Sequence, residues 1–404
     1  MQDTPKSNRL HIAIVGRRNG GKSSLINALT NQDIALVSDI PGTTTDPVFK
    51  AMEILPIGPC MIIDTAGFDD TGDLGELRIK KTREVLNQTD LAVLVIDPLV
   101  GITGSDLEIK TEIETRKIPL VGVVNKSDLA DIDTVALEKQ LGLPLIKVSA
   151  ATGQGIDELK ERIIQAAPFN FEEPAIVGDL IEPGDVCILV APVDGAAPKG
   201  RLILPQVQTI RDILDHAAIS VVVQDTELQE ALNKLTQKPK IVITDSQAFA
   251  RVAVDTPDDV GLTSFSILYA QYKGDLVELI RGAKAIKSLQ PGDKVLIAEA
   301  CTHHRQPDDI GKYQIPRWLR QQAGGELDIQ WSSGMGYPEN LEEYKLIIHC
   351  GACMINRRQM LHRIRKAREK GVPIVNYGVF LAYVNGILDR ALKPFPAADR
   401  AFRE

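Results

Sequence analysis

The sequence predicts an α/β protein built from three α/β domains with mostly parallel sheets. At 404 residues the chain is too long to fold around one hydrophobic core. Short apolar runs alternate with amphipathic stretches along the chain, which is typical of βαβ units. A hydrophobic content of 44% and a charged content of 25% are those of a soluble globular protein.

The alternation divides the chain into residues 1–168, 178–270 and 275–404. The stretch 165–185 is rich in proline and acidic residues and indicates a linker between the first two domains. The middle domain holds no chemical motif, so we expect it to mediate dimerisation. We expect strands over residues 10–16, 60–67, 91–98, 120–126, 144–150, 185–193, 218–225, 240–246, 293–301, 344–353 and 372–378.

Charge and cysteine content exclude several classes of protein. A net charge of -8 is unusual for a nucleic-acid binder, which needs a basic face. The longest apolar runs are far shorter than a membrane span, and residues 1–10 contain no secretory signal. Five cysteines spread over the chain fit a cytosolic protein. We therefore expect a cytoplasmic protein that binds neither nucleic acid nor membrane.

Residues 16–23, GRRNGGKS, fit the phosphate-loop pattern G-x-x-x-x-G-K-[ST] between an expected strand and an expected helix. Glycines there let backbone N–H groups converge on phosphates at a helix N-terminus. We expect Lys22 to reach the β- and γ-phosphates and the Ser23 hydroxyl to ligate Mg²⁺. The other loop residues expected to contact the nucleotide are Asn19, Gly20, Gly21 and Ser24.

Two further segments belong to the phosphate side of such a site. Asp64 and Gly67 lie in DTAG at the end of an expected strand, where the carboxylate can hold Mg²⁺ through water and the Gly67 N–H can face the γ-phosphate. PGTTTD, residues 41–46, falls where a switch loop belongs, and Thr44 is the expected Mg²⁺ ligand in it. We expect Lys22, Thr44 and Gly67 to take part in hydrolysis.

NKSD, residues 125–128, predicts which base the nucleotide carries. Asn125 and Asp128 can read the edge of the base, with the carboxylate accepting the N1–H and N2–H₂ donors that guanine has and adenine lacks. The other residues expected around the guanine are Lys126, Ser149 and Ala150. Because these motifs occur in the required order, the sequence predicts a P-loop GTPase (Ras-like) fold that binds GTP.

This motif set resembles the Era and tRNA-modification branch of the translation-factor-like GTPases, over roughly the first 160 residues. Phe68 follows DTAG where Ras-type enzymes carry the glutamine that orients water, so we expect slow hydrolysis without another source of charge. Asn19 stands where relatives that use K⁺ carry their K⁺-binding asparagine. The resemblance therefore implies K⁺-stimulated hydrolysis; the alternative is that Asn19 only forms a turn.

A second group of candidate ligands lies near the other end of the chain. Cys301 and His303 follow one expected strand, and His349, Cys350 and Cys353 follow another. If the strands are neighbours, these side chains can converge on one metal centre, and a helix N-terminus after the C-x-x-C would favour the thiolates. Such a set suits tetrahedral zinc and equally an iron–sulfur cluster. The remaining cysteines, expected to be ordinary buried residues, are Cys60 and Cys187.

A GTPase domain, a middle domain without a motif, and C-x-H followed about 45 residues later by H-C-x-x-C resemble the HydF family of FeFe-hydrogenase maturation GTPases over the whole chain. The resemblance implies a homodimeric scaffold that carries a 4Fe-4S cluster and delivers a diiron precursor to apo-hydrogenase, with radical-SAM maturases as further partners. The ligands it implies are Cys301, Cys350 and Cys353, with His303 and His349 as the family's histidines and the fourth ligand open.

One alternative from another class is an RNA-associated GTPase with a structural zinc domain. The acidic charge and an aromatic content of 4% argue against it. Two smaller features also have alternatives. The basic stretch 357–370 is expected to be a solvated helix face, or else to offset an anionic cluster, and Asn376 and Tyr377 could line the same crevice from a third strand end.

Overall fold

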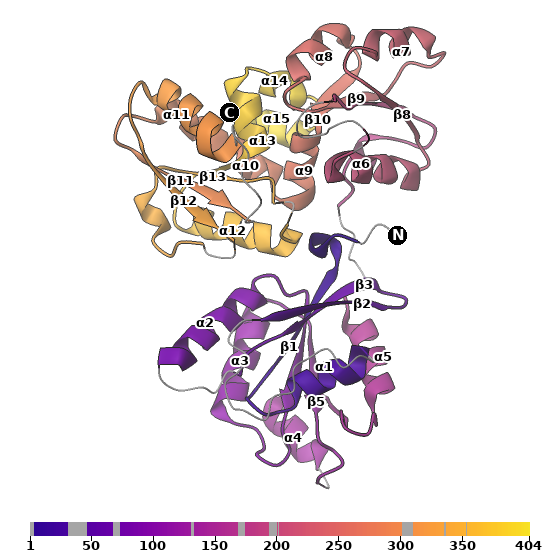
Figure 1. Cartoon of the computed structure of the whole chain (residues 1–404), viewed down its shortest axis with the longest axis vertical. Coiled ribbons are helices and arrows are strands. Elements are labelled where there is room, and N and C mark those ends of the chain that lie inside the picture. The colour runs from indigo at the N-terminus through magenta and orange to yellow at the C-terminus, as the bar shows by residue number, and fades with distance from the viewer. Residues whose placement is uncertain are drawn as a thin grey trace. The chain divides into compact units, whose positions relative to one another are not determined.

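The protein is described by a computed structural model, in which the chain forms two compact units, Met1–Phe171 and Glu172–Glu404. Figure 1 shows strands and helices alternating in both units. The residues that the structure describes are 4–30, 47–67, 73–130, 133–168, 174–193, 200, 202–300, 310–334, 337–352 and 354–404.

The elements of the first unit are β1 (Leu10–Gly16), α1 (Lys22–Thr30), β2 (Val48–Ile54), β3 (Gly58–Asp64), α2 (Asp73–Leu86), β4 (Leu91–Ile96), α3 (Gly104–Thr115), β5 (Leu120–Val124), α4 (Thr134–Leu141), β6 (Leu145–Lys147) and α5 (Ile156–Ala166). Its six-stranded sheet has the order β2-β3-β1-β4-β5-β6. Only β2 and β3 pair antiparallel among these described strands; the other neighbours are parallel.

Helices cover both faces of this first sheet. Apolar residues of α1 and α5 form one core with the sheet, and those of α2, α3 and α4 form a second core on the opposite face. The central strands β1 and β4 are buried along their whole length, which is why they appear in the sequence as continuous apolar runs. Parallel pairing brings the carboxyl ends of β1, β3, β4 and β5 to the same edge, where the GTP motifs begin.

The strands of the second unit are β7 (Val186–Val190), β8 (Ile219–Val223), β9 (Ile241–Thr244), β10 (Gly261–Ser264), β11 (Lys294–Glu299), β12 (Asp328–Ser333), β13 (Leu346–His349) and β14 (Ile374–Asn376). They form two parallel four-stranded sheets of order β10-β9-β7-β8 and β12-β11-β13-β14. The α-helices of the second unit are α6 (Leu204–Asp215), α7 (Leu228–Lys234), α8 (Phe249–Asp255), α9 (Phe265–Lys273), α10 (Leu276–Ala283), α11 (Ile315–Ala323), α12 (Arg357–Glu369), α13 (Tyr377–Val384), α14 (Leu388–Ala391) and α15 (Pro396–Arg403).

The two sheets of the second unit share one hydrophobic core. Helices α9 and α10 follow the first sheet directly and pack against α13 and β14 of the second. At Gly282 of α10 the helix lies so close to β14 that a side chain would collide with the Ile374 carbonyl. The expected α/β class with mostly parallel sheets is confirmed.

The expected linker is shorter than its composition suggests. Helix α5 continues to Ala166, and Ile176, Val177 and Ile181 are buried in the core of the second unit. The Asp212 carboxylate accepts hydrogen bonds from the Val177 and Gly178 N–H groups at 2.7 and 2.9 Å, which ties this segment to α6. The second half of the stretch 165–185 therefore belongs to the folded second unit.

Among the described residues, no helix combines the length and the apolar character needed to span a bilayer. Cys60 and Cys187 are fully buried, as expected, and burial raises the pKa values of their thiols to about 11 and about 12. Both are therefore unreactive core residues.

Candidate functional site

The phosphate loop joins β1 to α1 with three residues at positive φ. These are Gly16 (144°), Asn19 (60°) and Gly21 (86°), and two of the three are glycine because the left-handed region excludes most side chains. The Lys22 ammonium donates to the Gly16 and Arg17 carbonyls at 3.1 and 2.7 Å. The lysine is thus held inside the loop, where nucleotide phosphates would replace these carbonyls as its partners.

Asp64 meets the phosphate loop at the end of β3. The Ser23 hydroxyl donates to Asp64 Oδ2 at 2.6 Å, while the buried Asp64 Oδ1 has no hydrogen-bond partner among the described residues. Burial raises the pKa of the Asp64 carboxyl, and the Ser23 hydrogen bond and the Lys22 and Lys50 cations oppose that shift. A buried carboxylate oxygen without a partner, beside a hydroxyl, fits a Mg²⁺ site.

Asn125 links the base-reading loop to the phosphate loop. Its side chain is 1% exposed, and its Nδ2 donates to the carbonyls of Gly20 (3.1 Å) and Gly21 (3.4 Å). Its Oδ1 accepts from the Ala150 N–H at 3.1 Å, which adds the loop after β6. Three loops that are distant in the sequence therefore meet at this one side chain.

Lys126 strengthens the same junction and Asp128 faces outward. The Lys126 ammonium donates to the Asn19 carbonyl (2.7 Å) and pairs with Asp97 (2.6 Å) at the end of β4. Asp128 is exposed next to this junction, and buried Ser149 caps the turn before α5 by accepting from the Thr152 N–H at 3.2 Å. An exposed carboxylate above a fixed loop can accept donors from a base.

The remaining predicted GTP residues divide into two groups. Gly67 is buried directly against the backbone of Arg18, so that a Cβ there would lie 2.6 Å from the Arg18 nitrogen, and Ser24 is half-buried in the first turn of α1. Thr44 and Phe68 lie outside the described residues.

Lys50 is a buried cation near this site that no sequence motif indicates. Lys50 of β2 is 7% exposed, and its ammonium donates to Asn27 Oδ1 of α1 at 3.1 Å. Burial lowers the pKa of Lys50 and attraction to Asp64 raises it. No motif predicts it, because β2 is an edge strand of mixed character.

The structure brings together the two strand ends that carry the second group of ligands. Strands β11 and β13 are parallel neighbours with Ala298 opposite His349. The Ala300 N–H donates to Cys350 Sγ at 3.1 Å, and the Cys350 N–H donates to the Ala298 carbonyl at 2.9 Å. The Cys350 sulfur thus lies beside the residue that precedes position 301. The other predicted ligands, Cys301, His303 and Cys353, lie outside the described residues.

The His349 ring lies between the Cys350 backbone and Arg363. The ring is fully buried, with Nδ1 2.8 Å from the Cys350 carbonyl and Nε2 2.9 Å from the Arg363 guanidinium. Burial lowers the pKa of His349 to about 3, and the Arg363 cation adds to this. Both ring nitrogens are engaged, so iron could bind His349 only by displacing one of these partners.

The basic stretch 357–370 is only partly a solvated helix face. Within α12, Arg365 and Arg368 are exposed, as expected, but Arg363 is 2% exposed and faces the end of β13. Tyr377, at the end of β14, donates to buried Glu299 at 3.2 Å, two residues before position 301. A run of arginines in the sequence gives no sign of which member is buried.

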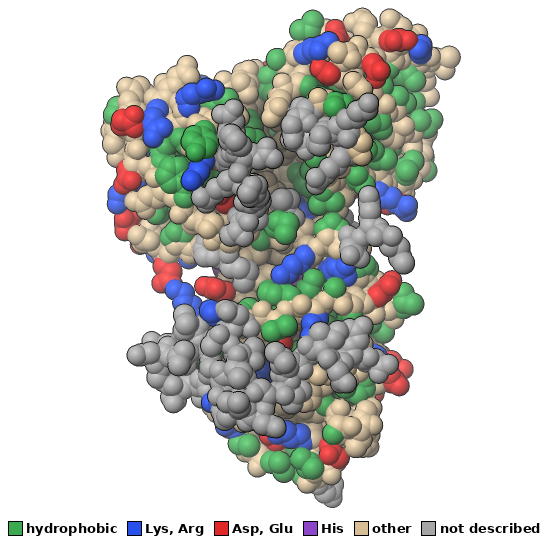
Figure 2. Space-filling view, in the orientation of Figure 1, with side chains coloured by type: hydrophobic (Ala, Val, Ile, Leu, Met, Phe, Trp, Pro, Cys, Tyr) green, Lys and Arg blue, Asp and Glu red, His purple; other side chains and the backbone are tan. Residues whose placement is uncertain are grey.

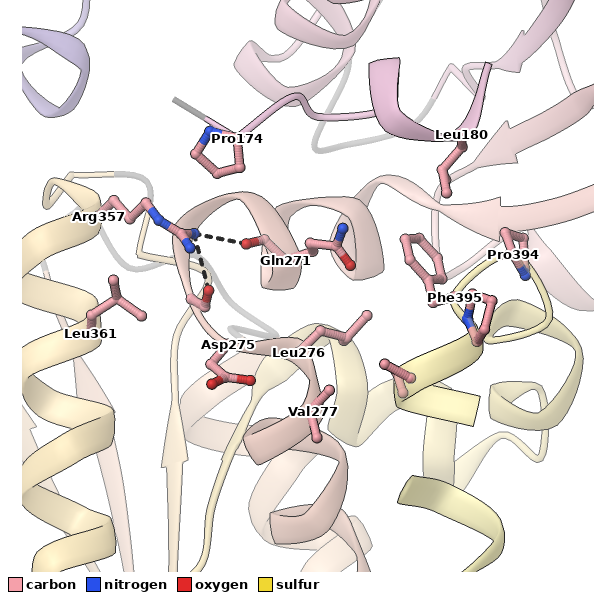
Figure 3. Close-up of a pocket in the computed structure, with 14 residues that line it drawn as sticks. Pro174, Leu180, Gln271, Asp275, Leu276, Val277, Arg357, Leu361, Pro394 and Phe395 are labelled. Carbon is pink, nitrogen blue, oxygen red and sulfur yellow. Dashed lines mark hydrogen bonds between the residues drawn. The ribbon is translucent and has the colours of Figure 1, made fainter. Parts of the chain in front are cut away.

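A pocket of about 420 Å³ lies in the second unit between α9, α10, α12 and α15 (Figure 3). In Figure 3 Arg357 lies at one end of the pocket, beside the end of α9, and its guanidinium donates to the carbonyls of Gln271, Tyr272 and Gly274 at 2.8, 2.6 and 3.0 Å. Asp275 in its wall caps α10 by accepting from the Glu278 N–H at 3.1 Å. These polar groups hydrogen-bond to the ends of α9 and α10, which indicates that they have a structural role.

Three known protein families match successive segments of the chain. Residues 11–126 match the family described as "50S ribosome-binding GTPase". Residues 176–274 match "Hydrogen maturase F dimerization domain" and residues 277–394 match "Hydrogen maturase F tetramerization domain". Residues from both of the last two segments line the pocket that contains Arg357.

Curated relatives match the GTPase segment. The tRNA modification GTPase MnmE of Chromobacterium violaceum is 41% identical over 162 residues, which are 40% of this chain and 35% of that protein. MnmE of Synechococcus is 43% identical over 164 residues, again 40% of this chain and 35% of that protein. The chain therefore spans about a third of the length of these relatives.

Similar solved structures include the G domain of the Thermotoga maritima FeoB iron transporter, at 28% identity and a TM-score of 0.31, covering 39% of this chain and 99% of that one. Aquifex aeolicus Era bound to GDP·AlF₄⁻ is 21% identical with a TM-score of 0.37, covering 53% of this chain and 94% of that one. The first unit of the protein is a GTPase domain on the evidence of its family match and its motifs.

Proposed function

The chain belongs to the hydrogen maturase F family, and from this we propose that it is a GTP-hydrolysing scaffold for assembly of a metal cluster. In this proposal it carries a 4Fe-4S cluster in the cytoplasm and delivers a diiron precursor to FeFe-hydrogenase, after exchange with radical-SAM maturases. The observation that carries the proposal is the contact between Cys350 Sγ and Ala300 N, which supports convergence of the two predicted ligand segments in a chain that also has a GTPase domain.

Hydrolysis of GTP is supported by the arrangement of the first unit. Lys22 and the positive-φ loop offer a phosphate cradle, Ser23 and Asp64 offer oxygens to Mg²⁺, and exposed Asp128 offers an acceptor to guanine. We propose Thr44 as a further Mg²⁺ ligand and Gly67 as an N–H donor to the γ-phosphate. The positive charge that Mg²⁺ supplies when bound would neutralise phosphate charge during transfer.

We propose that K⁺ stimulates hydrolysis and that Asn19 binds it. Asn19 is exposed in the phosphate loop, and its carbonyl accepts a hydrogen bond from the Lys126 ammonium, which fixes the backbone at this position. GTP hydrolysis should be several-fold faster in KCl than in NaCl at equal ionic strength. Asn19→Ala should remove the difference, and equal wild-type rates in the two salts would contradict the role.

The proposed cluster ligands are Cys301, Cys350 and Cys353, with His303 as a candidate for the fourth position. Three thiolates suit a 4Fe-4S cluster that keeps one exchangeable site, and this is chemically useful for a scaffold that receives and releases cargo. His349 is left out of the proposed ligand set because both ring nitrogens are engaged.

The experiment that tests the cluster uses the full chain, reconstituted with iron and sulfide without oxygen. We expect about four irons per chain, a brown colour with a thiolate-to-iron absorption band, and an electron paramagnetic resonance signal after reduction. Cys350→Ser should lose the band and keep GTP hydrolysis, whereas buried Cys187→Ser should keep both. A colourless wild-type protein with one zinc would instead favour the RNA-associated GTPase with a zinc domain.

We propose that two copies pair through β8. Among the described strands β8 ends its sheet, and Ile219 and Val222 on it are 51% and 45% exposed. Apolar side chains are visible in Figure 2 on the side of the second unit where Figure 1 places β8. An apolar edge strand is prone to pair with another strand, and the match to a dimerisation domain supports a second copy of the chain as the partner.

A further inference from the structure

Arg363 is an arginine held almost entirely inside the second unit. Its side chain is 2% exposed. One guanidinium nitrogen donates to His349 Nε2 at 2.9 Å, and the other donates to the Gly334 carbonyl, after β12, at 2.8 Å. Its central carbon lies 5.1 Å from the centre of the Tyr337 ring. The cation is therefore fixed by β13 and by Gly334 and Tyr337 after β12, in addition to its own helix.

His349 connects this cation to the cysteine segment. A guanidinium can only donate, so His349 Nε2 must accept, and the ring proton must then lie on Nδ1. That proton points to the Cys350 carbonyl at 2.8 Å. The hydrogen bonds thus run in one direction, from Arg363 through the ring to the backbone of Cys350, and they fix the orientation of the imidazole.

The charge of Arg363 lies two hydrogen bonds away from the backbone of Cys350. Burial lowers the pKa of the guanidinium, and attraction to Tyr337 and Cys350 opposes this. An iron–sulfur cluster bound by thiolates is an anion, and its reduction potential depends on net charge and on hydrogen bonds around the sulfurs. A buried cation at this place stabilises the reduced, more negative form more than the oxidised form.

We propose that His349 and Arg363 form a positioning pair that sets the reduction potential of the cluster, with His349 as the neutral link and Arg363 as the fixed charge. The proposal rests on the proposed function, because it requires a cluster on Cys350. It assigns His349 to support of the Cys350 loop and Arg363 to charge compensation.

The local structure explains why arginine is needed there. Helix α12 begins at an Asn356 cap, whose Oδ1 accepts from the Gln359 N–H at 3.1 Å, directly after the cysteine loop. From this helix the planar guanidinium of Arg363 donates at the same time to His349 Nε2 and to the Gly334 carbonyl, which lie on different segments. A lysine ammonium keeps the charge but does not reproduce this fork.

The test compares reconstituted wild-type protein with Arg363→Met and Arg365→Met by electrochemical titration of the paramagnetic signal. Arg365 is a matched control, since it lies on the same helix and is exposed. We expect Arg363→Met to bind iron and to have an equilibrium constant for one-electron reduction about tenfold smaller, a shift of about 59 mV to more negative potential. Arg365→Met should match the wild type.

Two further variants, Arg363→Lys and His349→Gln, test the same effect on the reduction potential. Arg363→Lys should fall between wild type and Arg363→Met, and it carries the comparison if the methionine variant does not fold by circular dichroism. His349→Gln should keep the iron and shift the potential in the same direction. Equal potentials in wild type and the Arg363 variants, or nitrogen hyperfine coupling that disappears in His349→Gln, would overturn the inference alone. A wild-type protein without an iron–sulfur cluster would overturn the proposed function, and the inference with it.

Discussion

Asn125 gives the sharpest prediction for the GTPase domain, because one buried side chain joins three loops. Asn125→Ala removes two well-formed hydrogen bonds of 3.1 Å and a weaker one of 3.4 Å. A typical hydrogen bond contributes about 1 kcal/mol net, and a buried group that loses its partner costs about 1 kcal/mol more. We therefore expect the first unit to lose about 2–3 kcal/mol of unfolding free energy.

The same change should weaken nucleotide binding. With the loops no longer joined, binding of GTP has to order them, and a cost of about 1.4–2 kcal/mol corresponds to roughly 10–30-fold weaker affinity. Titration with a fluorescent GTP analogue measures the affinity. Hydrogen exchange of the β1 and β5 amides, followed by mass spectrometry in the full chain, measures stability in the first unit alone.

Asp128→Ala is the matched control for this experiment. Asp128 lies three residues further along and is exposed, so its loss should weaken guanine binding without changing hydrogen exchange. Unchanged exchange and unchanged affinity in Asn125→Ala would refute the view that this side chain holds the site together. Equal exchange in Asn125→Ala and Asp128→Ala would refute the stability calculation.

Three other predictions concern charge, assembly and packing. Burial raises the pKa of the Asp64 carboxyl above its usual 3.8, so the nucleotide-free fold binds a proton there more tightly than the unfolded chain does. The fold therefore loses stability as the pH rises through the raised pKa. Asp64→Asn should abolish that loss in thermal scans and should also abolish Mg²⁺-dependent hydrolysis. Val222→Lys on β8 should convert dimers to monomers in analytical ultracentrifugation, whereas Val254→Lys on α8, at a position 85% exposed, should leave them intact. Gly282→Ala should lower the melting temperature of the second unit, at a cost of about 1–3 kcal/mol, because a methyl group there meets the backbone of β14.

The sequence predicted the fold best where strands are buried on both faces. β1, β4, β7 and β11 appear as continuous apolar runs because both of their faces pack against helices. β2 and β12 were missed because charged or polar residues interrupt their apolar residues, and β10 was missed because its four residues include glycine, threonine and serine.

The candidate sites were predictable to different degrees. Ser23, Asp64, Asn125 and Lys126 could be named because the chemistry of phosphate and guanine fixes both residue type and spacing. The role of His349 could not be derived, because a histidine beside a cysteine looks the same whether its nitrogens face a metal or an arginine. Burial of Arg363 depends on how α12 packs, which the local sequence does not specify.

The continuous core of the second unit also determines how this protein can be divided in the laboratory. Cutting near residue 275 would expose apolar surface on both pieces, since α9 and α10 belong to one core with both sheets. A fragment of residues 172–404 keeps that core whole, and mild proteolysis should release such a fragment rather than a free middle domain. Any experiment that swaps the GTPase domain between relatives should therefore join the pieces ahead of Ile176.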